Sequence, residues 1–262
     1  MEKLEILREA ISKKNRLLIA FSGGVDSSLL AKVAYDVLGD DALAITLDTV
    51  TLPRSELVAA RNIAADIGIP HKVYSFSEIE DEEFVKNTSD RCYFCKRKSA
   101  RFLKGIAKEE GIETVAYGVN ISDFSEHRPG IKACDEEGIW HPFVEASLTK
   151  SDVREISWGL GMPSWDKPST ACLSSRIPYG DQITIEKLKM VEDAEEILRS
   201  FGFLQSRVRL HGKIARIEVM CAEMEDLIAL GSEINESFKD LGFDYVSMDL
   251  LGYRSGSMDE VL

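Results

Sequence analysis

A glycine pair between two apolar runs constrains the fold of this chain more than any other feature. Residues 18–30 read LIAFSGGVDSSLL, so one apolar run enters the glycines and a second leaves them. Glycines at a strand-to-helix turn let backbone N–H groups approach an anion, and the helix points the positive end of its dipole there. The turn therefore predicts a phosphate site made by Ser22, Gly23, Gly24, Asp26, Ser27 and Ser28.

The acidic side chain of Asp26 indicates that a metal ion binds at the same turn. An acidic side chain at the start of the helix would repel phosphate unless a divalent cation lay between them, so Asp26 indicates Mg²⁺. The turn matches neither GxxxxGK[ST] nor GxGxxG, although it uses the same physical principle. The alternative is an ordinary glycine turn in which Asp26 and the serines cap the helix.

Short apolar segments alternate with helical stretches over the first two thirds of the chain. The apolar segments cover residues 16–21, 42–49, 71–76 and 114–120. Strands separated by helices of this length predict βαβ units, and therefore an α/β fold with a parallel sheet and helices on both faces. Ligands of such sheets bind at the carboxyl ends of the strands, where the glycine turn is expected.

The order of the predicted elements changes after an irregular segment at residues 163–180. A loop of this length is rarely kept in a compact domain without a functional use. The elements that follow are a helix, a strand pair, a helix and a strand, at residues 184–202, 206–220, 223–241 and 243–251. We therefore predict a nucleotide-binding domain at 1–180 and a smaller α+β domain at 181–262.

Composition and charge restrict the partners of the protein. The 262 residues include 32 Lys and Arg against 45 Asp and Glu, and the net charge of −13 argues against a broad nucleic-acid-binding surface. Residues 1–16 lack the apolar core of a signal peptide, and no apolar run of about 18 residues predicts a membrane span. Five cysteines, an odd number, argue against a disulfide framework. We expect a cytoplasmic protein without a nucleic-acid or membrane partner.

Three cysteines have the spacing of a metal or cluster site. Cys92 and Cys95 form a CxxC pair in DRCYFCKRK, and Cys172 lies far downstream in KPSTACLSSRIPYG. Zinc usually takes four protein ligands, whereas three thiolates with one open position suit a [4Fe–4S] cluster. A buried Cys172 and a CxxC pair of free or redox-active thiols remain the alternatives. Cationic residues that would stabilise thiolates stand nearby in sequence, at Lys96, Arg97, Lys98 and Arg176. Cys134 and Cys221 match no part of this pattern and are expected to be plain thiols.

The SGGVDSS turn resembles the signature of the PP-loop ATP pyrophosphatases, which adenylate a substrate and release pyrophosphate. Further segments in the same order, RCYFCK, WDKPSTACLSSRIPYG and RVRLHGKIARIEV, resemble the LarE family of ATP-dependent pyridinium-3,5-biscarboxylate mononucleotide sulfur transferases. This resemblance implies a PP-loop domain at 1–180 and a substrate-binding or oligomerisation domain after it. It also implies that the enzyme uses ATP and Mg²⁺ to activate each substrate carboxylate. A sulfur atom then replaces the activated oxygen, and the resulting thiocarboxylates serve the nickel-pincer cofactor of lactate racemase.

The resemblance also bears on the source of the sulfur. Family members with a CxxC pair hold a [4Fe–4S] cluster on three cysteines, matched here by Cys92, Cys95 and Cys172. Other members sacrifice the cysteine that corresponds to Cys172, which becomes dehydroalanine. The resemblance favours the cluster for this chain, while the donor of replacement sulfur stays unknown. It also implies a homo-oligomer.

A strand of the predicted smaller domain offers a phosphate site. Arg207 and Arg209 alternate along it, so both project from one face, and paired guanidinium groups suit a ligand phosphate. The resemblance places the nucleotide phosphate of the substrate there, with Glu218 and Asp226 near it. The alternative is a solvated strand face with ordinary ion pairs.

Other site residues follow from the resemblance. It supports Asp123 and Glu126, after the strand at 114–120, as polar residues that face the substrate. It implies catalytic roles for Cys172, Asp26 and Arg176, and Arg176 would stabilise the thiolate or hold the substrate.

Two other functions remain open. A tRNA thiolase of the PP-loop class would need a basic RNA-binding module, which the acidic chain does not offer. A regulatory protein that binds ATP without turnover would use the same glycine turn.

Overall fold

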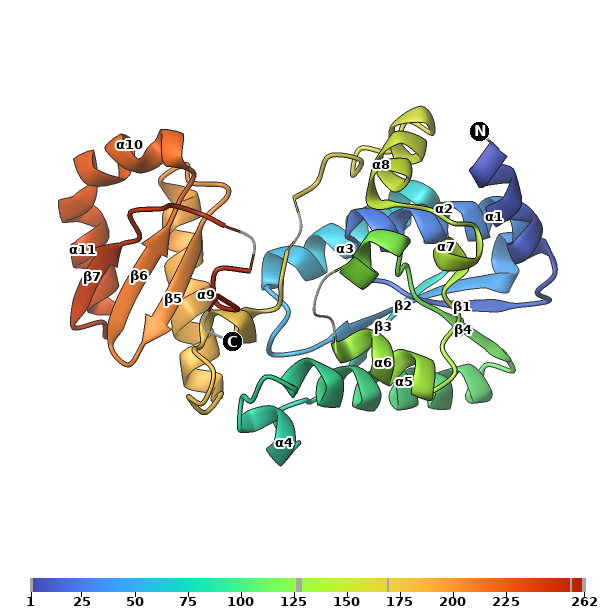
Figure 1. Ribbon diagram of the computed structural model, residues 1–262, viewed down its shortest axis with the longest axis horizontal. Helices are drawn as coiled ribbons and strands as arrows, with labels where there is room; N and C mark the ends of the chain where they lie inside the picture. Colours follow the sequence, from blue (N-terminus) through green and yellow to red (C-terminus); the bar gives the residue numbers. More distant parts are fainter. Residues whose placement is uncertain (1, 126–128, 169, 255, 261–262) are drawn as a thin grey trace. The chain divides into compact units, whose positions relative to one another are not determined.

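The computed structural model describes residues 2–125, 129–168, 170–254 and 256–260, and it divides into two compact units (Figure 1). The first unit comprises residues 1–78 and 92–170, and the second comprises residues 79–91 and 171–262. Residues 171–180, which precede the predicted domain boundary, thus belong to the second unit. The functional division at 180 and 181 stays a prediction.

The first unit contains a sheet of four parallel strands in the order β3-β2-β1-β4. In its centre, Leu17 pairs with Ala42 of one neighbouring strand and with Thr114 of the other. The strands span Leu17–Ala20 (β1), Ala42–Asp48 (β2), His71–Ser75 (β3) and Thr114–Ala116 (β4). The predicted α/β class with a parallel sheet is confirmed.

Helices cover both faces of this sheet (Figure 1). The helices α1, α2, α3, α7 and α8 share an apolar core with Leu17 and Ile19, whereas α5 and α6 pack on the opposite face with Leu18. One strand serves both cores because its successive side chains point to opposite faces. The helices span Glu2–Ser12 (α1), Val25–Leu38 (α2), Arg54–Ile67 (α3), Arg91–Glu109 (α5), Pro129–Glu136 (α6), Pro142–Glu145 (α7) and Lys150–Gly159 (α8).

The second unit has a small mixed sheet in the order β5-β6-β7. The predicted strand pair forms an antiparallel hairpin, Arg207–His211 (β5) and Ile214–Glu218 (β6), and Tyr245–Met248 (β7) lies parallel to β6. The helix predicted at 223–241 is divided at Leu230, and the two pieces form the crossover that a parallel neighbour requires. The helices of this unit span Glu82–Val85 (α4), Ile185–Ser200 (α9), Met224–Ala229 (α10) and Gly231–Asp240 (α11).

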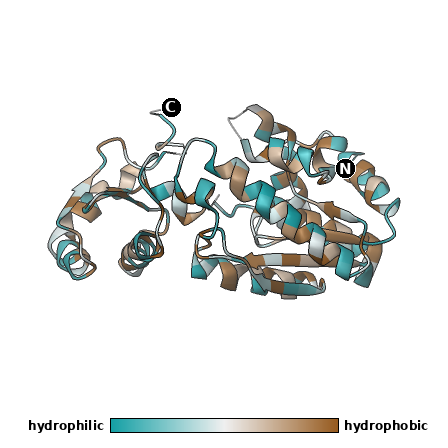
Figure 2. Cartoon of the chain, turned by 90° about the horizontal axis from the view of Figure 1, so that it is seen from below, coloured by the Kyte–Doolittle hydropathy of each residue, from teal (hydrophilic) through white to brown (hydrophobic). Residues whose placement is uncertain are grey.

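Helices in both units are amphipathic, as their two colours in Figure 2 show. Among the described residues, no helix is both long enough and apolar enough to cross a membrane.

Candidate functional site

The glycine turn closes on itself between β1 and α2. Gly24 is the N-cap of α2, and its carbonyl oxygen accepts hydrogen bonds from Ser27 Oγ at 3.1 Å and Ser28 N at 2.9 Å. Ser22 Oγ lies 3.2 Å from Ser27 Oγ. Ser28 Oγ is buried and finds no hydrogen-bond partner among the described residues. The turn therefore presents hydroxyl groups and the first N–H groups of a 14-residue helix, as an anion site requires.

Gly23 has a conformation that other residues rarely adopt. Its φ is +69°, and a Cβ atom built there would lie 2.8 Å from Cα of Ala60 in α3. The missing side chain lets the loop lie directly against α3.

We expect Gly23→Ala to lower the free energy of unfolding by about 2–5 kcal/mol. A positive φ costs a residue with a side chain about 1–2 kcal/mol, and overpacking adds about 1–3 kcal/mol. Chemical denaturation measures the loss. Two control variants separate the causes. Gly138→Ala tests the positive φ alone, because Gly138 has φ +71° with no described atom within 4 Å of a built Cβ. Gly24→Ala tests a glycine of the same turn without a positive φ, because Gly24 has φ −79°. Equal losses for Gly23→Ala and Gly138→Ala would show that contact with Ala60 is unimportant.

Asp26 is held by two side chains from distant parts of the first unit. Asn120, which follows β4, donates from Nδ2 to Oδ1 of Asp26 at 3.0 Å, and Lys150 at the start of α8 pairs with Oδ2. Gly118 permits this approach, since a Cβ there would lie 3.0 Å from the backbone carbon of Asp26. Sequence reasoning missed Asn120 and Lys150, which are 94 and 124 residues away from Asp26.

Lys167 is a second lysine at the loop that sequence reasoning missed. Its Nζ donates to the Gly23 carbonyl at 3.1 Å and to Glu56 Oε2 at 2.7 Å. Thr170 Oγ1 donates to the other oxygen of Glu56 at 3.2 Å. Glu56 thus anchors the segment that ends the first unit, and Lys167 fixes that segment to the glycine turn.

The residues of the turn fit a nucleotide phosphate with Mg²⁺. Mg²⁺ prefers oxygen ligands and usually keeps several waters and phosphate oxygens beside one or two carboxylates, and Asp26 offers one such carboxylate. Within the described part of the chain, no group of three or more His, Cys, Asp or Glu side chains is arranged to hold a metal ion. A magnesium ion at Asp26 would therefore depend on phosphate and water for its other ligands.

The segment after β4 contains one of the two predicted substrate acids. Asp123 lies in a 3₁₀ helix, Ile121–Ser125, and its Oδ2 accepts a hydrogen bond from the backbone N–H of Asn120 at 2.9 Å. The carboxylate thereby shapes the turn that presents Asn120 to Asp26. Glu126 lies outside the described residues, and the substrate roles of both acids stay predictions.

The CxxC pair lies at the start of α5, as the second and fifth residues of the helix. Cys92 and Cys95 are three residues apart on a helix, a spacing that places both on one face. Cys92 is exposed and Cys95 is half-buried. The positive end of the helix dipole favours thiolates at this end of the helix, so the pair is suited to bind a metal or a cluster.

Cys172 belongs to the second unit, where Arg176 holds the surrounding backbone. Cys172 is exposed, and its Sγ lies 2.9 Å from Ser174 Oγ. Arg176 is only 1% exposed and donates to both carboxylate oxygens of Glu195, at 2.8 and 3.0 Å. Its Nη1 donates to the carbonyls of Ala171 at 2.7 Å and Cys172 at 3.1 Å. Arg176 therefore fixes the chain around the thiol from inside the unit.

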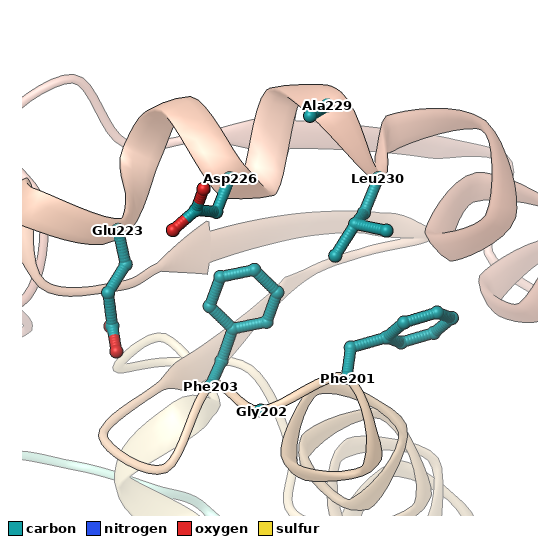
Figure 3. Close-up of a pocket in the computed structure, with 7 residues that line it drawn as sticks. All are labelled: Phe201, Gly202, Phe203, Glu223, Asp226, Ala229 and Leu230. Atoms are coloured by element: carbon teal, nitrogen blue, oxygen red, sulfur yellow. The ribbon is translucent and has the colours of Figure 1, made fainter.

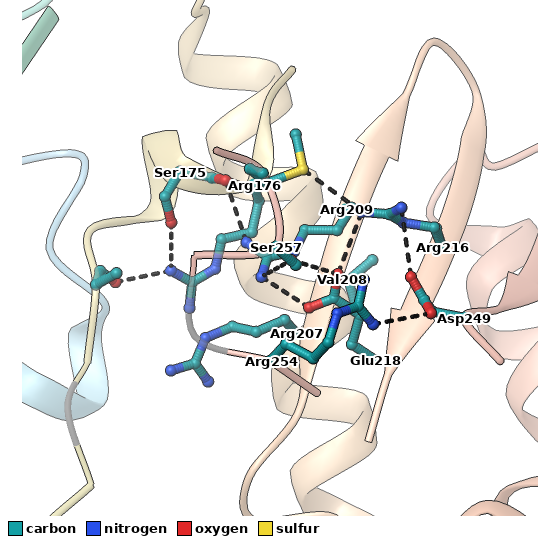
Figure 4. A network of polar contacts seen from close by, with 12 residues as sticks. Ser175, Arg176, Arg207, Val208, Arg209, Arg216, Glu218, Asp249, Arg254 and Ser257 are labelled. Atoms are coloured by element: carbon teal, nitrogen blue, oxygen red, sulfur yellow. Dashed lines mark hydrogen bonds and ion pairs between the residues drawn. The ribbon is translucent and has the colours of Figure 1, made fainter. Parts of the chain in front are cut away.

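Arg207 and Arg209 are buried beside this segment (Figure 4). Arg209 donates to Glu218 Oε2 at 2.7 Å and to the Ser175 carbonyl at 3.2 Å, while its buried Nε finds no partner in the described chain. The Arg207 guanidinium lies 5.1 Å from the ring centroid of Tyr253. Burial, with the nearby Arg176 cation, lowers the pKa of Arg207. Both arginines are thus buried, unlike the residues of a solvated strand face, and a cluster of buried cations suits an anionic ligand.

Asp226 lines a different part of the second unit. It lies in α10 and borders a pocket of about 280 Å³ (Figure 3). The pocket is lined by Phe201, Gly202, Phe203, Glu223, Asp226, Ala229 and Leu230. Arg207 and Arg209 are not among these residues, and the substrate role of Asp226 stays a prediction.

The other two cysteines differ in exposure. Cys134 is buried in the core between the sheet and α5, and burial raises the pKa of its thiol. Cys221 is exposed, with Sγ 3.7 Å from the Leu251 carbonyl.

A parallel α/β sheet whose first strand leads through SGGVDSS into a helix defines the PP-loop class of nucleotide-binding enzymes. In agreement, residues 2–111 match the family profile described as NAD synthase. An uncharacterized protein of Synechocystis sp. is 45% identical over 99% of this chain and 98% of its own length. The pyridinium-3,5-bisthiocarboxylic acid mononucleotide synthase of Lactiplantibacillus plantarum is 36% identical over 99% of this chain and 95% of its own. The tRNA-specific 2-thiouridylase MnmA of Azorhizobium caulinodans is 28% identical over 66% of this chain and 54% of its own.

The chain belongs to the family of the pyridinium-3,5-bisthiocarboxylic acid mononucleotide synthases, the LarE family. The predictions of this family, of the PP-loop fold and of an ATP-dependent enzyme are thereby confirmed.

Proposed function

We propose that the protein adenylates the carboxylates of pyridinium-3,5-biscarboxylic acid mononucleotide with ATP and converts them to thiocarboxylates for a nickel-pincer cofactor. One observation carries the proposal: the match to the mononucleotide synthase covers 99% of the chain. It therefore includes the segment around Cys172 and the buried arginines as well as the glycine turn.

Adenylation overcomes the low reactivity of a carboxylate. If the carboxylate were not activated, its leaving group would have to be oxide, whereas an acyl-adenylate releases AMP. A carboxylate oxygen of the substrate attacks the α-phosphorus of ATP, the bond to the pyrophosphate oxygen breaks, and pyrophosphate leaves. The N–H groups at the start of α2 and an Mg²⁺ ion held by Asp26 would stabilise the charge that develops on pyrophosphate.

We propose Cys92, Cys95 and Cys172 as the ligands of a [4Fe–4S] cluster. When bound, such a cluster would supply the sulfide sulfur that replaces AMP. The N-terminus of α5 favours the thiolates of Cys92 and Cys95, and Arg176 holds the backbone that carries Cys172. The alternative is that Cys172 gives up its own sulfur, in which case the CxxC pair has no part in transfer.

The second unit is proposed to hold the nucleotide end of the substrate. Arg207 and Arg209 would bind its phosphate, and Glu218 orients Arg209 through the 2.7 Å contact. Asp123, Glu126 and Asp226 are proposed as further substrate residues. We also propose that the enzyme works in the cytoplasm as a homo-oligomer and that a separate sulfur donor restores it.

The test is to incubate protein purified without oxygen with ATP, Mg²⁺ and the pyridinium dicarboxylate mononucleotide. We expect one AMP and one pyrophosphate for each carboxylate that becomes a thiocarboxylate, with iron and sulfide in the purified protein. A gel shift with bulk tRNA tests the thiolase alternative, and the net charge of −13 predicts no shift. No AMP with the authentic substrate would contradict the proposal and favour a regulator that binds ATP without turnover.

A further inference from the structure

Lys150 stands at a rigid position of the first unit without a role in the function proposed so far. It is the first residue of α8, whose N-cap Thr149 forms a capping box with Asp152. The hydrogen bond from Lys3 lowers the pKa of Asp152 to about 2, so this cap stays charged. The backbone N–H of Lys150 also donates to Ser122 Oγ at 3.1 Å. The backbone of Lys150 is thus fixed from several sides, while its side chain extends to the glycine turn.

The ammonium group of Lys150 balances the carboxylate proposed to hold magnesium. Lys150 pairs with one oxygen of Asp26 and Asn120 donates to the other, so both oxygens already have partners. The two side chains of the ion pair are 35% and 26% exposed, respectively. A lysine has a long flexible stem, and partial exposure leaves room for the ammonium to change partners.

The Lys150 ammonium would leave Asp26 if this carboxylate held magnesium. Two cations a few ångströms apart repel each other, and a divalent ion repels an ammonium more strongly than a univalent ion does. The phosphate chain of ATP, if bound at the start of α2, would offer the ammonium a new anionic partner. Lys167 would keep its partners, because its carboxylate, Glu56, is not the one proposed to hold magnesium.

We propose that Lys150 is a phosphate-binding residue that pairs with Asp26 in the free protein and with the pyrophosphate group when MgATP is bound. The inference rests on the proposed function. During adenylation, the electron pair of the breaking phosphorus–oxygen bond stays on pyrophosphate, where the charge increases. Lys150 donates a hydrogen bond to that oxygen and transfers no proton. Its positive charge thus acts at the site where negative charge develops.

The test compares Lys150→Met with the wild type and with Lys32→Met. Lys32 lies about two turns further along α2 and pairs with Asp36 at 2.6 Å, both with 30% exposed side chains, so it controls for a lost ion pair. For Lys150→Met, we expect affinity for inorganic pyrophosphate with Mg²⁺ to fall about 10- to 100-fold, as on losing a hydrogen bond between charged groups. The Mg²⁺ concentration for half-maximal ATP binding should fall at least about threefold, because no ammonium group then competes with Mg²⁺ for the Asp26 carboxylate.

The outcomes separate this role from a structural one. If Lys150 has only a structural role, Lys150→Met will lower the unfolding midpoint but bind pyrophosphate as tightly as Lys32→Met does. That result would overturn the inference. An unchanged or higher Mg²⁺ concentration for half-maximal ATP binding would overturn it as well. If Lys150→Met fails to fold, Lys150→Arg and Lys150→Gln replace it: only the arginine should keep pyrophosphate affinity near the wild-type value. Wild-type protein that binds neither ATP nor pyrophosphate would instead contradict the proposed function itself.

Discussion

Cys172→Ser is expected to abolish thiocarboxylate formation while the substrate is still adenylated and pyrophosphate is still released. The activating residues lie around the glycine turn of the first unit, and the substitution leaves them unchanged. A serine hydroxyl can neither bind iron as a thiolate does nor supply sulfur. Mass spectrometry of the product, together with pyrophosphate measurement, checks both parts of this result.

Cys221→Ser is the matched control, because Cys221 is also an exposed thiol of the second unit. It should retain full sulfur transfer. Cys92→Ser then separates the two sulfur sources. A cluster requires this residue, so the variant should lose iron and multiple turnovers, whereas a sacrificial Cys172 would still complete its single transfer.

Two results would contradict these expectations. Thiocarboxylate formed by Cys172→Ser would show that the sulfur does not pass through this residue. Wild-type chain that loses one H₂S equivalent from Cys172 after turnover would contradict the cluster and leave the sacrificial mechanism.

Local sequence patterns predicted most of the fold. The apolar runs that enter and leave the glycine turn became β1 and α2, and the strand pair predicted at 206–220 became the hairpin of β5 and β6. Such elements depend on near neighbours, which a linear pattern records. The break at Leu230 and the parallel placement of β7 depend on packing against the rest of the second unit, which the pattern does not record.

The candidate site was predictable only where it is local. Ser22–Ser28 forms one continuous turn, but the partners of Asp26 come from 94 and 124 residues away, and Lys167 meets Gly23 across 144 residues. Only the fold brings these residues together. The sequence also predicted Arg176 near Cys172 without indicating that Glu195 occupies its guanidinium group.

Arg176→Met is expected to lower the free energy of unfolding of the second unit by about 3–5 kcal/mol. The side chains of Arg176 and Glu195 are 1% and 9% exposed, and removing one partner of a buried pair leaves the other charge uncompensated. Glu195 would then keep the hydrogen bond that the backbone N–H of Val208 donates to its Oε1 at 3.1 Å, which does not neutralise its charge. Denaturation monitored in the presence and absence of reductant measures the change.

Arg199→Met provides the control on α9, the helix that carries Glu195. Its pair with Glu196 has side chains 38% and 65% exposed, so the loss should stay below about 1 kcal/mol. Arg176→Lys should recover little of the stability, because one ammonium cannot reproduce the fork that holds both Glu195 oxygens and the Ala171 and Cys172 carbonyls. If Arg176→Met and Arg199→Met were equally stable, Arg176 would be free to serve the substrate. A large loss for Arg176→Met, with altered alkylation of Cys172, would instead establish that it positions the thiol.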